Sequence, residues 1–196
     1  MPAIIDKESV REDILMAFRK CIDKKPIDKI TLRDVAEEAG ISHAKLLYYF
    51  NSRDEMVHEY MRFSRGYLID KYEKWFDEHP RSNYKTDSDY FNDLFDYAAI
   101  GEARETQLNS IIQTYVLSHY DDAAKNLLEE EYGAWLDTLR RCLKKAFGKD
   151  CSTESAESIM VVLSGLFICR YNGALTGELN GQIMSQLTKL SELSDK

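Results

Sequence analysis

Residues 32–51, LRDVAEEAGISHAKLLYYFN, meet the steric requirements of two short helices joined by a tight turn. Ala36 is small enough for the helices to cross closely, and Gly40 stands at the turn, where a positive φ costs little only for glycine. Ser42 is placed to cap the second helix. The apolar residues that can fill the core between the helices are Val35, Ala39, Ile41 and Leu46.

This window predicts a helix-turn-helix, whose second helix would enter the major groove of DNA with its N-terminal residues. An ordinary helical hairpin is the alternative, because Ala-Gly-Ile-Ser at residues 39–42 is a weak signal alone. The small residue, the glycine and the cap all fall within one short window, and together they favour DNA binding.

Further helix starts are marked by polar residues on both sides of this window. Capping boxes fit Ser9-Val-Arg-Glu12 and Ser52-Arg-Asp-Glu55, and Thr31-Leu-Arg-Asp34 is a shorter version. Pro26 disfavours helix at the residue before it. The apolar spacing predicts helices over 9–24, 31–38, 42–49, 52–77, 87–99, 101–118, 121–148, 153–176 and 179–193.

The composition favours an all-α protein without a membrane segment. The chain contains 3 Pro and 9 Gly, and no useful strand alternation is visible. Its N-terminus carries charges where a signal peptide needs an apolar run. The longest apolar stretch, 159–169, is too short to span a bilayer. We therefore expect a cytoplasmic protein that does not enter a membrane.

The net charge of −8 disfavours a nucleic-acid partner at first sight. Its distribution changes this view, because residues 1–65 carry 12 Lys and Arg against 12 Asp and Glu, whereas residues 66–196 carry the whole acidic excess. The helix-turn-helix lies in the neutral part. A protein that reads DNA needs a basic face, not a basic total.

Residues 30–56, ITLRDVAEEAGISHAKLLYYFNSRDEM, closely resemble the signature of the TetR family of bacterial transcription regulators. The resemblance implies about nine helices, a dimer built on the last two, and a ligand cavity in the C-terminal domain. It divides the chain into a helix-turn-helix DNA-binding domain over 1–51 and a helical ligand-binding and dimerisation domain over 52–196. The implied function is that of a repressor that binds a palindromic operator in double-stranded DNA.

The resemblance also assigns roles within the motif. Thr31 matches a threonine that touches a phosphate, and Lys45 and His43 match positions that reach bases or backbone. Arg53 stands where the family usually has lysine and can hold a phosphate. The DNA-binding residues expected on this basis are Thr31, Ser42, His43, Ala44, Lys45, Tyr48, Tyr49 and Arg53.

Two positions depart from the family pattern. Leu47 replaces a tyrosine that contacts a phosphate, so this contact is expected to be lost or to shift to Tyr48. Pro26 replaces a glycine after the first helix, which indicates a different turn. Tyr49 and Leu46 could equally be core residues, whereas nothing in packing requires Lys45.

The predicted helix 153–176 is apolar nearly all round, so we expect it to be covered on two sides. The segment after it places apolar residues at coiled-coil-like spacing. Two copies of this pair would form a four-helix dimer interface, and a monomer with a large core is the alternative. The interface residues expected are Leu166, Ile183, Leu187 and Leu190.

Aromatic residues are abundant beyond the motif, and most must be ordinary core. A subset is expected to line a pocket for a small, largely apolar effector. The candidates are Trp75, Phe95, Tyr115, Trp135 and Tyr171. Helix 52–77 would connect this pocket to the reading helix. The acidic runs 121–122 and 129–131 are expected to be solvated.

Other classes of protein find less support in the sequence. Glu55-Met-Val-His58 has the spacing of a di-iron helix, but no second copy follows. No zinc-protease motif, nucleophile elbow, phosphate loop or dinucleotide fingerprint appears, so we expect neither an enzyme nor a cofactor. The 4 cysteines form no metal-binding cluster. A helical scaffold that has lost DNA binding is the better alternative, with Leu47 as its only support.

Overall fold

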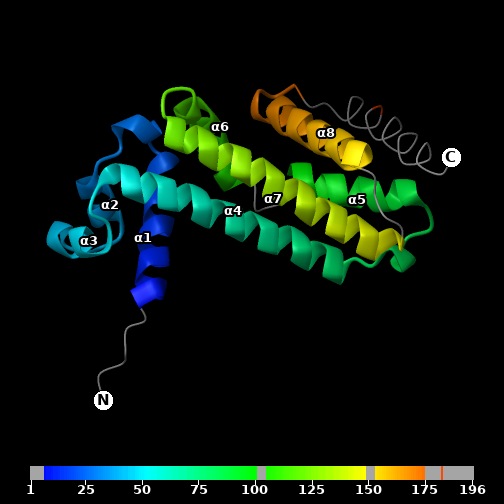
Figure 1. Cartoon of the computed structure of the whole chain (residues 1–196), viewed down its shortest axis with the longest axis horizontal. Coiled ribbons are helices and arrows are strands. Elements are labelled where there is room, and N and C mark those ends of the chain that lie inside the picture. The colour runs from blue at the N-terminus through cyan, green and yellow to red at the C-terminus, as the bar shows by residue number, and fades with distance from the viewer. Residues whose placement is uncertain (1–6, 101–104, 149–152, 175–181, 183–196) are drawn as a thin grey trace, which may run out of the picture. The chain divides into compact units, whose positions relative to one another are not determined.

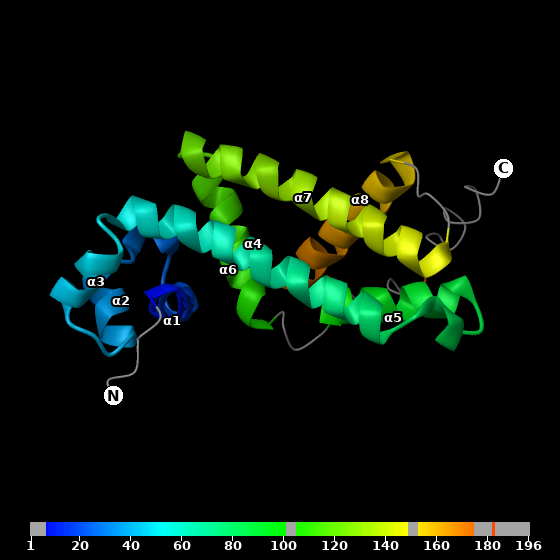
Figure 2. The same cartoon turned by 60° about the horizontal axis from the view of Figure 1, so that its bottom comes forward.

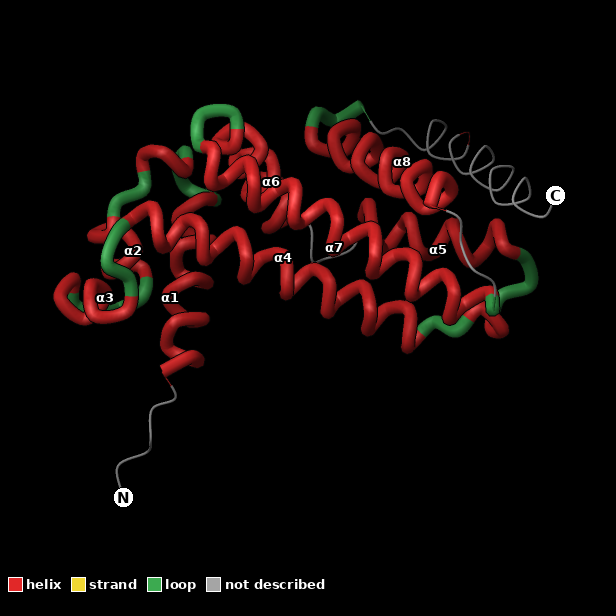
Figure 3. The backbone as a smooth tube through the Cα atoms, in the orientation of Figure 1, coloured by secondary structure: helices red, strands yellow, loops and turns green. Residues whose placement is uncertain are grey.

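The computed structural model describes residues 7–100, 105–148, 153–174 and 182. In these ranges the backbone forms α-helices, two short 3₁₀ turns and no strand, which confirms the all-α class (Figures 1 and 3). The elements are α1 (Lys7–Ile22), η1 (Ile27–Lys29), α2 (Leu32–Glu38), α3 (His43–Tyr49), α4 (Arg53–Glu78), η2 (Arg81–Asn83), α5 (Asp87–Ile100), α6 (Glu105–Ser118), α7 (Asp122–Phe147) and α8 (Thr153–Tyr171).

Most predicted helices recur with small shifts at their ends. The exception at the N-terminus is α1, which begins at Lys7, so Ser9 lies inside the helix and its predicted capping role was wrong. Lys7 and Glu8 are good helix formers that extend the helix backwards. The predicted helix 179–193, with Ile183, Leu187 and Leu190, lies outside the described residues except for Gln182.

The Cα positions divide the chain into two compact units. The first contains the described residues of 1–68 and 109–131, and the second those of 69–108 and 132–196. Helices α4, α6 and α7 contribute residues to both units.

The core of the first unit supports the short helices of the motif. Phe18 of α1 and Tyr60 of α4 are buried and meet edge to face, with ring centroids 5.1 Å apart. The Tyr60 hydroxyl and Ser110 Oγ of α6 form a buried hydrogen bond of 2.6 Å. Two views agree that α1, α2 and α3 lie side by side (Figures 1 and 2). The motif is therefore packed on one side against α1 and the start of α4.

The core of the second unit is largely aromatic. Tyr90 of α5 is fully buried, and its ring lies 5.5 Å from Trp75 and 5.5 Å from Phe147, centroid to centroid. Leu166 and Met160 of α8 close this core over α5.

Candidate nucleic-acid interface

Side chains cap both helices of the predicted motif. Thr31 Oγ1 accepts a hydrogen bond from the Asp34 backbone N–H at 3.3 Å, while Asp34 Oδ2 accepts one from the Thr31 backbone N–H at 2.7 Å. Ser42 Oγ accepts a hydrogen bond from the Lys45 backbone N–H at 3.1 Å. Each cap satisfies an N–H group that has no partner within its helix. The predicted starts of α2 and α3 are thereby confirmed.

The turn between the helices has the backbone that its sequence predicts. Gly40 has a φ of 65°, in the left-handed region that suits glycine. The Ile41 N–H donates to the Ala36 carbonyl at 3.0 Å, which closes the turn over the end of α2. Of the residues expected in the core between the helices, Val35 and Leu46 are buried, while Ala39 and Ile41 are half-buried against it; Ala36, expected where the helices cross, is buried too.

The first turn of α3 is exposed, although the helix is anchored. Leu46 has none of its surface exposed, which makes it a core residue. Around it on the helix, Lys45 and His43 are exposed, and the Lys45 side chain forms no hydrogen bond or ion pair with the described residues. The N-terminal end of α3 therefore presents a positive charge and an imidazole to solvent. The other expected contact residues that are exposed here are Ser42 and Ala44.

Tyr48 and Tyr49 differ in their surroundings. Tyr48 is 69% exposed, and the Lys7 ammonium lies 5.1 Å from its ring centroid. Tyr49 is half-buried, meets Tyr48 edge to face at 5.0 Å, and its carbonyl accepts a hydrogen bond from Arg11. Tyr49 therefore packs the end of α3, whereas Tyr48 is available to a partner. Leu47, beside it, is 40% exposed.

Two basic residues near the motif were missed in the sequence. Lys7 adds a cation beside Tyr48, and Arg33, in the first turn of α2, is exposed. Arg33 could have been found, because a basic residue two positions after the Thr31 cap must lie near the same end of the helix. Lys7 depends on the packing of α1 and could not have been found.

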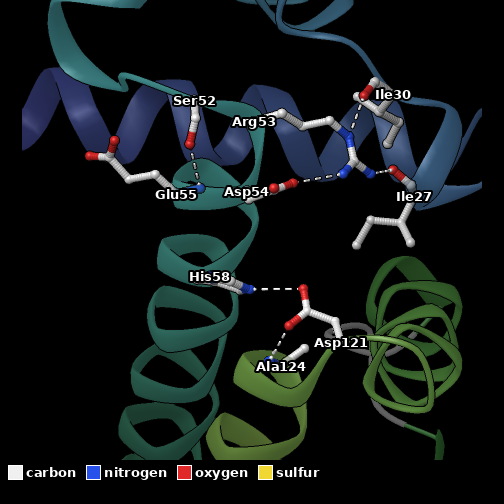
Figure 4. Close-up of polar contacts among 9 residues, drawn as sticks. All are labelled: Ile27, Ile30, Ser52, Arg53, Asp54, Glu55, His58, Asp121 and Ala124. Carbon is white, nitrogen blue, oxygen red and sulfur yellow. Dashed lines mark hydrogen bonds and ion pairs between the residues drawn. The ribbon is translucent and has the colours of Figure 1, made fainter.

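Arg53 is bound within the chain (Figure 4). Its Nε donates to the Ile30 carbonyl at 2.9 Å, its Nη2 donates to the Ile27 carbonyl at 2.5 Å, and its Nη1 lies 3.3 Å from the Asp54 carboxylate. The guanidinium therefore ties the start of α4 to the connection between α1 and α2. A phosphate contact by Arg53 stays a prediction and would have to share this group.

The carboxylate of Asp34 forms a compact network at the start of α2. It accepts a hydrogen bond from Thr31 Oγ1 at 2.7 Å and pairs with Lys25 Nζ at 2.6 Å. The Lys25 ammonium and the hydrogen bonds from Thr31 lower the pKa of Asp34 to about 2. The carboxylate thus stays charged at neutral pH and holds the Thr31 hydroxyl in place.

The Glu55 and His58 side chains do not share a site. His58 Nε2 lies 3.1 Å from Asp121 Oδ2, while Asp121 Oδ1 accepts a hydrogen bond from the Ala124 N–H at 3.0 Å (Figure 4). The Glu55 carboxylate instead accepts two hydrogen bonds from Asn51. Asp121, expected to be merely solvated, therefore caps α7 and pairs with α4. Within the described ranges, no group of three or more His, Cys, Asp or Glu could hold a metal ion.

The expected pocket residues fall into two groups. Trp75, Phe95 and Trp135 belong to the aromatic core of the second unit. Tyr115 is 56% exposed and belongs to the first unit, and Tyr171 is 48% exposed at the end of α8. The structure therefore brings three of the five together.

Helix α8 combines a buried face with exposed apolar side chains. Leu166 is 2% exposed and lies in the aromatic core of its own chain. Val161 and Ile168 are 64% and 54% exposed. The dimer contact expected of Leu166 stays a prediction, and Val161 and Ile168 are better placed to meet a second chain. No described helix is long and apolar enough to cross a membrane.

Residues 14–60 match the model of the tetR family of bacterial regulatory proteins. No curated protein matches the sequence significantly. The match covers part of α1, all of α2 and α3, and the start of α4, so it includes the exposed first turn of α3 described above.

Solved structures are similar over nearly the whole chain. A TetR transcription regulator from Haloarcula marismortui has a TM-score of 0.68 at 14% identity, covering 95% of this chain and 98% of that one. A TetR family member from Streptomyces coelicolor A3 has a TM-score of 0.69 at 18% identity, with 92% and 97% covered. A protein from Saccharomonospora viridis in complex with choline has a TM-score of 0.68 at 18% identity, with 94% and 96% covered. At identities this low, the similarity establishes the fold.

Proposed function

We propose that this chain is a TetR-family regulator, because its residues 14–60 match the model of that family of bacterial regulatory proteins. As a dimer, it would repress transcription by binding a palindromic operator. The observation that carries this proposal is the exposed first turn of α3, capped by Ser42 and carrying Lys45. DNA binding is assigned to residues 1–51 and regulation to residues 52–196.

The reading helix would meet DNA through side chains at its N-terminal end. Lys45 can reach a guanine edge or a phosphate, and His43 can do either. Tyr48 and the nearby Lys7 would contact the backbone and so make up for Leu47, where the family usually has tyrosine. The charge of the chain as a whole does not oppose this, because residues 1–65 are neutral.

A dimer would supply the second reading helix. Exposed Val161 and Ile168 on α8 leave apolar surface that a second copy can cover. Two reading helices related by a twofold axis would bind half-sites about one helical turn apart, roughly 34–36 Å. The operator would therefore be a palindrome. Bound to the chromosome, the dimer would act in the cytoplasm.

The effector would be a small, largely apolar molecule bound in the second unit. Trp75, Phe95 and Trp135 belong to the aromatic core of this unit, so a ligand that enters it would meet apolar and aromatic side chains. The choline complex of the Saccharomonospora viridis protein is a precedent for a small bound molecule in this fold. Helix α4 carries residues of both units and would link ligand to DNA, so each would change the affinity for the other by the same factor.

Footprinting on the DNA upstream of the protein's own coding region tests the proposal. Protection should cover two inverted half-sites spaced by one helical turn. When DNA binding is coupled to dimer formation, protection should rise more steeply with protein concentration. An unrelated fragment of equal length serves as the control. Equal affinity for both fragments would contradict specific operator binding and favour the scaffold alternative.

A further inference from the structure

The connection between α1 and α2 is held by two side-chain amides of α6. Asn109 Nδ2 donates to the Ile22 carbonyl at 2.9 Å, and Gln113 Nε2 donates to the same carbonyl at 3.2 Å. Gln113 Oε1 accepts a hydrogen bond from the Ile27 N–H at 2.5 Å. Gln113 Nε2 also donates to Asn109 Oδ1 at 3.1 Å, so the two amides orient each other.

These contacts satisfy backbone groups that the helices leave open. Ile22 is the last residue of α1, so its carbonyl accepts no hydrogen bond within that helix. The Ile27 N–H belongs to the first residue of η1 and has no acceptor within that turn. Both residues are buried, and a buried backbone group without a partner costs about 1–3 kcal/mol. Gln113 meets both needs because an amide carries a donor and an acceptor.

The same connection is held from α4. Arg53 Nη2 donates to the carbonyl of Ile27, whose N–H donates to Gln113. One residue between α1 and α2 is therefore bound by α6 on one side and by α4 on the other. All of these residues belong to the first compact unit.

We infer that Asn109 and Gln113 are positioning residues that hold the helix-turn-helix through the connection between Ile22 and Ile27. Helix α6 thereby supports the connection that leads into the helix-turn-helix, as the start of α4 does through Arg53. Residues 105–108 of α6 belong to the second unit, so α6 also has residues in both units. This inference deepens the proposed function and rests on it for its effect on DNA binding.

The first test is amide hydrogen exchange of the free full-length protein, which requires no DNA. Gln113→Met keeps the size of the side chain and removes its hydrogen bonds. It should speed exchange at the Ile27 N–H and at backbone N–H groups of α2 and α3 by about tenfold, because one or two net hydrogen bonds are lost. Asn126→Ala removes an exposed amide of α7 and should leave these rates unchanged.

The second test is operator affinity over a range of salt concentrations. Gln113→Met should weaken binding about tenfold with an unchanged salt slope, because glutamine contacts no phosphate. Gln113→Met and Arg53→Met together should weaken binding by less than the product of the single effects, since both residues fix Ile27. If Gln113→Met folds poorly, Asn109→Ala removes the donor to the Ile22 carbonyl and the acceptor that orients Gln113, and it should give the same pattern at about threefold.

The outcomes separate the inference from the proposed function. The inference would be overturned if the rates of amide hydrogen exchange in α2 and α3 were unchanged in both Gln113→Met and Asn109→Ala, whatever the DNA result. Wild-type protein that fails to bind the upstream DNA would overturn the proposed function, while exchange would still decide whether α6 holds the motif.

Discussion

Ser42 Oγ accepts a hydrogen bond from the backbone N–H of Lys45 at 3.1 Å, so the cap of α3 and the lysine expected to reach DNA share one helical turn. Ser42→Ala should lower the free energy of unfolding by about 1 kcal/mol, because that N–H loses its partner. Ser42→Asp restores an acceptor and should recover the stability, which denaturant unfolding can measure. Equal losses in both variants would show that the cap is not the cause.

Glu131 of α7 makes the stability of the fold depend on pH as neutrality is approached. Burial raises the pKa of this carboxyl to about 7, against a smaller lowering by the charge of Arg65. In the unfolded chain the group ionises near its ordinary pKa of 4.5, so stability is full below that value and falls as pH rises to about 7. Glu131→Gln should therefore stabilise the protein at pH 8 by at most about 3 kcal/mol, and not at pH 4. Stabilisation of the same size at both pH values would contradict this account.

Tyr90 offers a test of the aromatic core. Its hydroxyl is buried without a hydrogen-bond partner among the described residues. Tyr90→Phe should raise the free energy of unfolding by about 1 kcal/mol, because an unsatisfied buried group is removed. Tyr84→Phe is the matched control and should lower stability, since the Tyr84 hydroxyl donates to Asp93. Thermal unfolding of the two variants in parallel measures both effects. A lower stability of Tyr90→Phe than of the wild type would contradict the assignment of an unsatisfied hydroxyl.

Dimerisation can be separated from folding on α8. Ile168→Glu changes a side chain that is 54% exposed and should give folded monomers. Leu166→Glu places a charge in the chain's own core and should destabilise the fold by several kcal/mol. Sedimentation and circular dichroism distinguish the two effects. An unchanged dimer for both Ile168→Glu and Leu187→Glu would exclude this interface.

Local signals explain what could be predicted from the sequence. Ser42 and Thr31 cap helices through contacts three residues away, and Gly40 sets its own turn. A similar capping box at Thr86 and Asp89 was visible in the same way and was overlooked.

Long-range contacts explain which features could not be predicted from the sequence. Asp121 caps α7 as its sequence permits, but its pairing with His58 depends on a residue 63 positions away. Glu131, expected to be solvated within an acidic run, is half-buried, and this burial raises its pKa. Gln113 lies 86 positions from Ile27, so nothing in the local pattern marks it as part of the motif's support.

Operator affinity of Lys45→Ala, measured by fluorescence anisotropy beside Lys125→Ala, tests most directly the claim that α3 reads DNA. Lys125 is an exposed lysine of α7 and provides the same loss of charge away from the motif. Lys45→Ala should weaken binding to the operator by about 1–3 kcal/mol and relax the preference at one position of each half-site if the lysine reads a guanine, while Lys125→Ala binds as the wild type does. Wild-type affinity in Lys45→Ala, or an equal loss in both variants, would contradict the assignment of α3 as the reading helix.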